Sequence, residues 1–186
     1  CRVIGFNHLG RLGRLGNQMF QYAALRGIAA NNGHNFCFPF YGTAVDDGIG
    51  NMLRTELFDC FEMSSVVPLN LQSIDQNRPY KRESGFEFDE KLFNNCPDWV
   101  SLYGFFQTEK YFKNVEDIIR KDFTFKKEIL DPCKEMMGSL YAEDPDPTIV
   151  ALHIRRTDYI QNSANHNNLG LDYYTKALAK FPDDAN

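Results

Sequence analysis

The chain has 186 residues, 43% of them hydrophobic and 14% aromatic, which is enough to build one ordinary core and argues against an intrinsically disordered protein. Its net charge is -5, which argues against a general surface for nucleic acids or anionic membranes. Any anion site must therefore come from a local cluster of basic residues.

The five cysteines are widely spaced and contain no C-x-x-C pair, so the sequence favours free thiols over a zinc site or a disulfide framework. No apolar run is long enough to span a membrane, and no signal peptide is visible. The chain begins with Cys1 rather than Met, so we expect a preceding segment, for example an anchor that associates with a membrane.

The first forty residues have the pattern that opens an α/β unit. The expected elements are a strand at 2–6, a glycine-rich loop at 10–16, a helix at 18–30 and a strand at 36–40. The helix has apolar residues at helical spacing, with Asn17 as its expected N-cap and Gly33 as its expected stop. Strand, loop, helix and strand in this order predict an α/β fold with a parallel sheet.

The next hundred residues carry weaker signals. Turn residues break 41–98 into short pieces for which the sequence predicts no topology. The aromatic stretch 99–107 has β character, and 108–125 has helical spacing. A further helix is expected at 126–141, either begun or kinked by Pro132.

A second α/β layer is expected near the end of the chain. Residues 142–148 have the composition of a linker, and 148–154, "TIVALHI", have that of a strand buried on both faces of a parallel sheet. A helix follows at 171–181, with Asp172 as its cap. One strand and one helix cannot bury their own apolar faces, so we expect the protein to continue past Asn186 or this piece to lean on the first domain.

Two segments have residues suited to binding an anion. The loop from Gly13 to Gln18 would let backbone approach a ligand at a helix N-terminus, although a tight turn with no ligand explains the same spacing. At the end of the expected second-layer strand, Arg155 and Arg156 would be poorly solvated without a partner, which a diphosphate supplies through bidentate bonds. The alternative is a structural ion pair with Asp158.

A metal site is not expected. Asp144-Pro145-Asp146 resembles the D-x-D of metal-dependent glycosyltransferases, but its central proline and its linker-like flanks favour a solvated linker. The histidines at 8, 34 and 166 are isolated, without the helical spacing of a metal pair.

Four blocks, taken together and in order, resemble the α-1,2-fucosyltransferases of glycosyltransferase family 11. They are "GRLGNQMFQYA" at 13–23, "GFFQTEKYF" at 104–112, "HIRRTDY" at 153–159 and "DYYTKAL" at 172–178. More distantly, the first and third blocks resemble the wider group that includes α-1,6- and protein O-fucosyltransferases. The resemblance implies a GT-B-like α/β architecture, in which GDP-fucose lies between two Rossmann-like halves. It assigns 1–145 to the N-terminal, acceptor-side half and 146–186 to the incomplete start of the donor-binding half.

The activity that the resemblance implies is metal-independent, inverting transfer of L-fucose from GDP-fucose to the 2-hydroxyl of a galactose in a glycan. The alternatives are an inactive nucleotide-sugar-binding fragment and a protein O-fucosyltransferase-like enzyme. The resemblance implies a cytoplasmic or membrane-associated enzyme if the source is bacterial, and a Golgi type II membrane protein if it is animal.

The roles expected of the site residues combine the residue chemistry with the resemblance. Arg156, then Arg155, would bind the diphosphate, and Asp158 would take the acceptor proton or orient an arginine. The catalytic set is Asp158, Arg156 and Asn17, and the donor-binding set is His153, Arg155, Arg156, Gly16, Asn17 and Gln18. Two departures are visible: Thr157 stands where many members carry glycine, and the chain stops at "FPDDAN" before the family's later donor-site blocks. The first "GRL", at 10–12, is interpreted as a local duplication or insertion, with no role for Arg11.

Overall fold

A computed structural model describes most of the chain as two compact units. The described residues are 2–143, 146, 149–156, 159–160, 163–164 and 166–181. The first unit comprises 1–45 and 52–126, and the second comprises 46–51 and 127–186. We describe each unit by itself. The break after Lys126 falls earlier than the predicted domain boundary at 145, which concerns the domains of a GT-B enzyme and stays a prediction.

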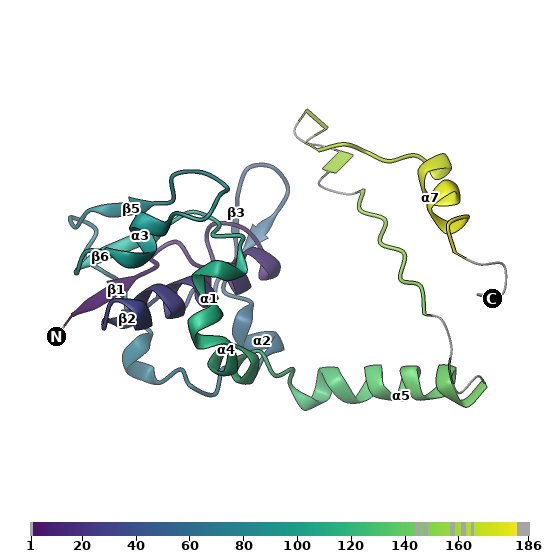
Figure 1. Ribbon diagram of the computed structural model, residues 1–186, viewed down its shortest axis with the longest axis horizontal. Helices are drawn as coiled ribbons and strands as arrows, with labels where there is room; N and C mark the ends of the chain where they lie inside the picture. Colours follow the sequence, from purple (N-terminus) through teal and green to yellow (C-terminus); the bar gives the residue numbers. More distant parts are fainter. Residues whose placement is uncertain are drawn as a thin grey trace. The chain divides into compact units, whose positions relative to one another are not determined.

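The first unit is built on a parallel four-stranded sheet of order β2-β1-β6-β5 (Figure 1). Its strands are β1 (Val3–Gly5), β2 (Asn35–Cys37), β5 (Tyr80–Arg82) and β6 (Val100–Tyr103). In register, Ile4 pairs with Phe36 on one side and Val100 on the other, while Tyr80 pairs with Ser101. The predicted α/β class is therefore confirmed, with strands at three of the expected places.

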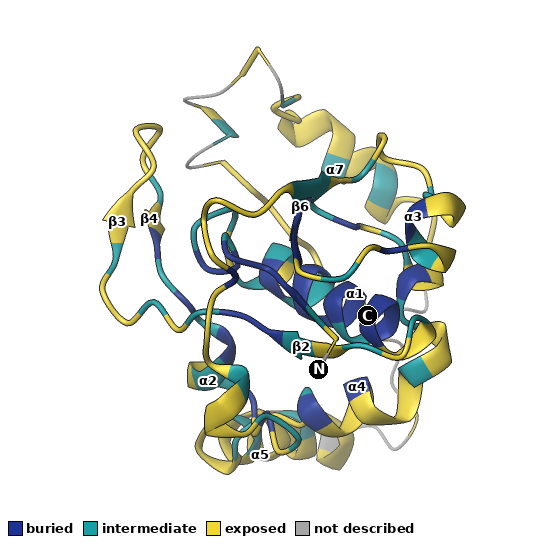
Figure 2. Ribbon diagram, turned by 90° about the vertical axis from the view of Figure 1, so that its left-hand side faces the viewer, coloured by how far each residue is buried: buried dark blue, intermediate teal, exposed yellow. Residues whose placement is uncertain are grey.

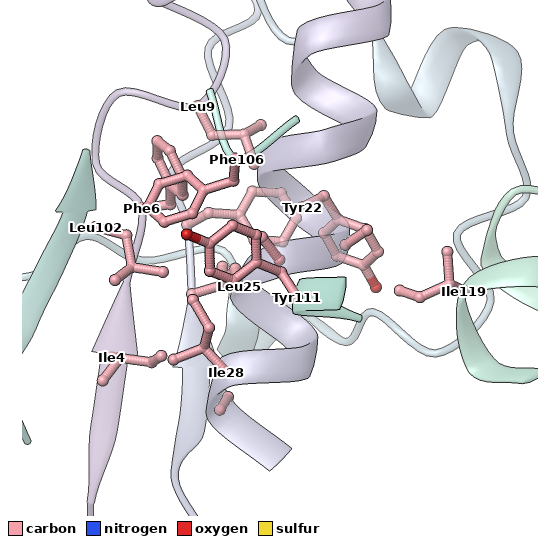
Figure 3. Close-up of a cluster of buried hydrophobic side chains, with 14 of the residues drawn as sticks. Ile4, Phe6, Leu9, Tyr22, Leu25, Ile28, Leu102, Phe106, Tyr111 and Ile119 are labelled. Carbon is pink, nitrogen blue, oxygen red and sulfur yellow. The ribbon is translucent and has the colours of Figure 1, made fainter. Parts of the chain in front are cut away.

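Helix α1 (Leu15–Asn31) lies on one face of the sheet and forms the centre of the core. Figure 3 shows Tyr22, Leu25 and Ile28 of this helix beside Ile4 and Leu102 of the strands. Burying these side chains is favourable because each Leu or Ile removed from water contributes about 1.5–3 kcal/mol. The helical apolar spacing in the sequence thus marks the face that the sheet covers.

Helix α1 ends where the sequence predicts but begins earlier than predicted. Gly33 follows the helix with φ 63°, so it is the predicted helix stop. The predicted N-cap Asn17 is wrong: the helix begins at Leu15, and Arg14 occupies the N-cap in extended conformation without a side-chain capping bond. The turn at Gly13, with φ 85°, starts the helix earlier than the side-chain pattern indicates.

Short elements account for most of the rest of 38–126. They are β3 (Val45–Asp46), β4 (Met52–Leu53), α2 (Leu57–Cys60), η1 (Pro68–Asn70), α3 (Glu90–Asn94), η2 (Glu109–Tyr111), η3 (Lys113–Val115) and α4 (Glu116–Asp122). The last residue of β3 belongs to the second unit. The stretch expected to be helical at 108–125 is thus divided into η2, η3 and α4. The apolar spacing was correct for the buried Tyr111 and Ile119, although the backbone is not one helix.

The second unit contains α5 (Lys127–Glu143) and α7 (Leu171–Leu178). Helix α5 runs through Pro132, so this proline does not begin it. The N-cap of α7 is Gly170, and Asp172 lies in its first turn, so the predicted cap is wrong. Figure 2 shows that both helices are largely exposed or half-buried.

The strand predicted at 148–154 is wrong for the part that the structure describes. Residues 149–156 have no strand assignment and are all exposed, including Ile149 and Ile154 at about half of their surface. A strand takes its hydrogen bonds from a neighbouring strand, and the described residues of this unit form no ladder with 149–156.

Four cysteines, Cys37, Cys60, Cys96 and Cys133, are free thiols, as the sequence predicted for the described part of the chain. Burial raises the pKa of Cys37 to about 11 and that of Cys96 to about 12. Among the described residues, no helix is long and apolar enough to cross a membrane.

Candidate functional site

The order in which the chain adds strands to the sheet of the first unit reverses between β1 and β6. From β1 the chain moves to β2 on one side, and the strand on the other side, β6, comes much later in the sequence. In open α/β sheets, ligands bind outside the carboxyl ends of the strands at such a switch point. The segments that leave this point are 6–14 after β1 and 104–107 after β6.

The N-terminus of α1 lies in the first of these segments. Gly13 is required here because a Cβ would come within 2.3 Å of the amide nitrogen of Asn17 and because φ is positive. Gly16 is exposed, and a Cβ there would meet no atom within 4 Å. No described side chain caps the helix. An uncapped N-terminus with open space beside it offers backbone N–H groups and a positive dipole end to an anion.

The basic side chain of this loop is already paired. Arg14 Nη2 donates to Glu56 Oε1 at 3.1 Å, while the other carboxylate oxygen, Oε2, is buried without a described partner. This carboxylate offsets the charge of Arg14 beside the helix N-terminus. The loop is therefore a weaker anion holder than its glycine and arginine content indicates.

Asn17 faces the second segment of the switch point. Its Oδ1 accepts a hydrogen bond of 2.8 Å from Gln107 Nε2. Gln107 is held by its neighbours, since the Glu83 carboxylate accepts from the backbone N–H groups of Phe105 and Phe106 at 2.5 and 3.0 Å. Sequence reasoning missed Gln107, although its block "GFFQTEKYF" was recognised, because a partner 90 positions away leaves no local signal.

Gln18, in contrast, is part of the scaffold. It is fully buried, and its Nε2 donates to the carbonyl of Arg54 at 2.8 Å while its Oε1 accepts from the N–H of Glu56 at the same distance. These bonds fasten α1 to the segment before α2. The amide of Gln18 is committed to them, so it reaches a ligand only by giving them up.

Arg11 of the first "GRL" copy has a structural role that the sequence did not predict. Its guanidinium donates to the carbonyls of Leu53 and Thr43, and it lies 4.3 Å from the centre of the Tyr41 ring. Within the copy, Gly10 also has positive φ, 89°, and packs against Thr55. Gly10 and Arg11 of the first copy therefore hold the segment after β2 against the glycine loop.

A pocket of about 640 Å³ lies beside α1, and none of these polar groups lines it. Its wall consists mainly of apolar side chains and includes none of the predicted site residues. The lining residues are Met19, Phe20, Ala23, Glu109, Phe112, Lys113, Glu116, Ile119, Arg120 and Phe123. We place the candidate site at the switch point instead, because polar side chains from several loops meet there.

The predicted phosphate-binding segment lies in the second unit. His153, Arg155 and Arg156 are exposed, so the expected poor solvation of the two arginines is wrong for this structure. The guanidinium of Arg155 lies 4.7 Å from the centre of the Tyr159 ring, which stacks on His166 at 3.9 Å. Asp158, the predicted base, lies outside the described residues, as do Asp144 and Pro145 of the D-x-D-like segment.

The described residues contain no group of three or more His, Cys, Asp or Glu side chains placed to hold a metal ion. The groups gathered at the switch point are instead amides, glycine backbone and a helix N-terminus, which suit a polar or anionic organic ligand.

A parallel sheet with a glycine loop at its switch point is consistent with the Rossmann-like domain of a glycosyltransferase. The family model described as Glycosyl transferase family 11 matches residues 2–186. The chain belongs to this family, and the predicted resemblance is confirmed.

Among curated proteins, the chain is 27% identical over 154 residues to galactoside alpha-(1,2)-fucosyltransferase 1 of Homo sapiens, covering 80% of this chain and 38% of that protein. It is 25% identical over 155 residues to galactoside alpha-(1,2)-fucosyltransferase 2 of Oryctolagus cuniculus, covering 82% of this chain and 40% of that protein. The chain thus spans about two fifths of the length of these relatives. No solved structure gives a significant match.

Proposed function

We propose that this chain belongs to an enzyme that transfers L-fucose from GDP-fucose to the 2-hydroxyl of a galactose in a glycan, with inversion and without a metal. The observation that carries the proposal is the family match over 2–186. The names of the relatives, which are galactoside alpha-(1,2)-fucosyltransferases, support fucose as the transferred sugar and a galactoside as the acceptor. In this proposal, the unit with the parallel sheet is the acceptor-side half of a GT-B-like enzyme.

The chemistry follows from the charge that the reaction creates. The acceptor oxygen attacks C1 of fucose, the bond from C1 to the β-phosphate oxygen breaks, and GDP leaves with the electron pair. Arg156, with Arg155 second and His153 in support, would stabilise the charge on the diphosphate through charge-assisted bonds. Asp158 would take the acceptor proton, as the only carboxylate in the "HIRRTDY" block.

On the opposite side, Gly16 and Asn17 would approach the sugar-phosphate. The open space at Gly16 and the uncapped α1 N-terminus support close approach of backbone N–H groups. Gln107 would hold the Asn17 side chain in place through their hydrogen bond. Gln18 would act indirectly, by fixing the start of α1.

The compartment is proposed conditionally: cytoplasmic or membrane-associated for a bacterial source, and the Golgi lumen for an animal one. The tests below use the full-length enzyme to which this chain belongs, with GDP-fucose and a galactoside. An inactive nucleotide-sugar-binding protein would bind GDP without transfer, and a protein O-fucosyltransferase would modify a folded protein domain and not a galactoside.

The test is the replacement Arg156→Ala, which we expect to lower the transfer rate about 10²–10³-fold, as loss of one charge-stabilising donor does. The matched control is Arg120→Ala, because Arg120 is also exposed and its ion pair among the described residues lies within α4, with Glu116 at 2.8 Å. In the same assay, Asp158→Asn should lower turnover and flatten its pH profile. Near-normal transfer by Arg156→Ala would refute the assignment of this arginine, and an unchanged profile for Asp158→Asn would refute the base.

A further inference from the structure

A cluster of His8, Tyr80, Arg82 and Tyr103 occupies the carboxyl end of the sheet and has no role so far. The His8 ring lies 5.0 Å from the Tyr103 ring and 5.4 Å from the Tyr80 ring, between ring centres. The two tyrosine rings are 6.2 Å apart, and the Arg82 guanidinium lies 4.1 Å above the centre of Tyr103. We call this set the aromatic–basic cluster.

The register of the strands explains why these side chains meet. Arg82 pairs with Tyr103 in the parallel register of β5 and β6, so both side chains project from the same face of the sheet. Leu102, the neighbour of Tyr103, belongs to the core that α1 covers. The cluster therefore lies on the opposite face of the sheet, at the same carboxyl edge as the switch point.

The cluster has unused hydrogen-bonding groups. Among the described residues, none bonds the hydroxyls of Tyr80 and Tyr103 or the guanidinium of Arg82, and the Nδ1 atom of His8 is buried without a partner. Buried polar atoms in proteins are normally satisfied, so an unpaired one beside free donors indicates a ligand or water position.

The charges in the cluster are uneven. Burial, and secondly the Arg82 cation, lower the pKa of His8, so its ring is neutral at pH 7 and offers one donor and one acceptor. The carboxylate nearest in sequence to Arg82, Glu83, is already engaged by two backbone N–H groups. Two phenols, a neutral imidazole and one guanidinium suit the hydroxyls and the C–H face of a saccharide better than they suit a doubly charged phosphate.

We propose that the aromatic–basic cluster binds the acceptor saccharide, with the tyrosine rings against its C–H face and with Arg82 and His8 bonded to its hydroxyls. The inference rests on the proposed function and deepens it, because it places the acceptor on the sheet face opposite α1, at the edge where Asn17 approaches the donor. A galactoside is the ligand class that the proposal commits to.

The experiment compares Arg82→Ala with Arg78→Ala in the full-length enzyme to which this chain belongs. Arg78 is the matched control, because its guanidinium lies 5.8 Å from the ring of Trp99, just before the same two strands begin. A third variant, Arg82→Gln, keeps most of the side-chain stem beside the Tyr103 ring and removes the guanidinium. It should raise the acceptor KM as Arg82→Ala does, so it keeps the proposal testable if the larger change affects folding. Binding of methyl β-D-galactopyranoside and of GDP is followed through the NMR signals of the His8 ring, and the KM values of galactoside and GDP-fucose are measured.

We expect the galactoside, and not GDP, to shift the His8 signals, and Arg82→Ala to raise the acceptor KM at least tenfold while the GDP-fucose KM changes less than twofold. Equal behaviour of Arg82→Ala and Arg78→Ala, or His8 signals that respond to GDP and not to galactoside, overturns the inference. Transfer that persists with an unchanged acceptor KM removes this subsite and leaves the proposed function. Arg82-dependent galactoside binding by the full-length enzyme without any transfer supports the subsite and removes the proposed function.

Discussion

Asp122 is a fully buried carboxylate whose hydrogen bonds join three segments of the first unit. It accepts from the hydroxyl of Tyr22 at 2.5 Å, and from the backbone N–H and hydroxyl of Ser65 at 2.8 and 2.6 Å. Arg26 Nη1 lies 3.6 Å from the same carboxylate. Tyr22 and Arg26 lie in α1 and Ser65 lies in the coil after α2. The Asp122 carboxylate at the end of α4 therefore holds both segments in place.

Replacing this carboxylate is expected to destabilise the protein strongly. Asp122→Ala leaves the nearly buried Arg26 cation with its bonds to Ser65 and Tyr22 but without the carboxylate that balances its charge. Breaking a buried ion pair in this way costs about 3–5 kcal/mol. Tyr22→Phe is the matched control, because it keeps the ring and removes only the two hydrogen bonds of the hydroxyl, to Asp122 and from Arg26, at a cost of about 1 kcal/mol each. Urea unfolding of the three proteins gives the free energies. A loss of under 1 kcal/mol for Asp122→Ala would contradict a structural role for the network.

At the residue scale, the sequence predicted the position of the glycine loop better than the role of each side chain beside it. Asn17 and Gln18 are adjacent and both polar, yet Asn17 faces Gln107 at the carboxyl edge while Gln18 is buried against Arg54. Which of two neighbouring amides is buried depends on where α1 begins. That start is set by the backbone turn at Gly13, which the side-chain pattern does not show.

At the element scale, a prediction succeeded where the element makes its backbone hydrogen bonds within itself and failed where it needs a partner strand. Helix α1 makes its own and was predicted from apolar spacing. The apolar, β-branched run at 149–154 has strand composition, but a strand needs a partner, and the described residues supply none. The short elements between 41 and 98 are fixed by contacts such as those of Arg11 with Leu53, which are distant in sequence.

The packing of α1 on η2 depends on one glycine. A Cβ at Gly27 would lie 1.8 Å from the backbone carbonyl oxygen of Tyr111, so the two elements would have to separate. We expect Gly27→Ala to lower the free energy of unfolding by about 3 kcal/mol or more, through overpacking against rigid backbone. Thermal and urea unfolding measure the change.

The control for Gly27 lies in the same helix. In Gly16→Ala the added Cβ would meet no atom within 4 Å. Alanine also stabilises a helix by up to about 1 kcal/mol relative to glycine. This variant should therefore be as stable as the parent or slightly more so. Similar destabilisation by both alanines would mean that helix α1 is sensitive to any change and that close approach to Tyr111 is not the reason for Gly27.

At the scale of the whole molecule, the buried core belongs to one unit. Every member of the main hydrophobic cluster in the described chain lies between Ile4 and Phe123. Helices α5 and α7 instead expose apolar side chains, among them Met136 at 62% and Leu171 at 81%. Large apolar side chains exposed in this number are typical of surfaces that bind another protein segment or a ligand.

A chain that ends at Lys126 should therefore fold. This shorter chain keeps the whole hydrophobic cluster. Changes away from a core have small effects on stability, so we expect its free energy of unfolding to stay within about 1 kcal/mol of the parent's. Removing α5 and α7 should also lower the binding of a fluorescent apolar dye, because their exposed side chains are gone. Urea unfolding and dye fluorescence are the measurements.

The matched comparison is a chain that ends at Asn114 and so also loses α4. This removes the buried Ile119 and Asp122, and with Asp122 the partner of Tyr22 and Arg26, so the chain should lose cooperative unfolding. If the chain ending at Lys126 behaves like this shorter one, residues after 126 stabilise the first unit, and its core is not self-sufficient. If both fold like the parent, the Asp122 network is dispensable, which the unfolding of Asp122→Ala would reveal independently.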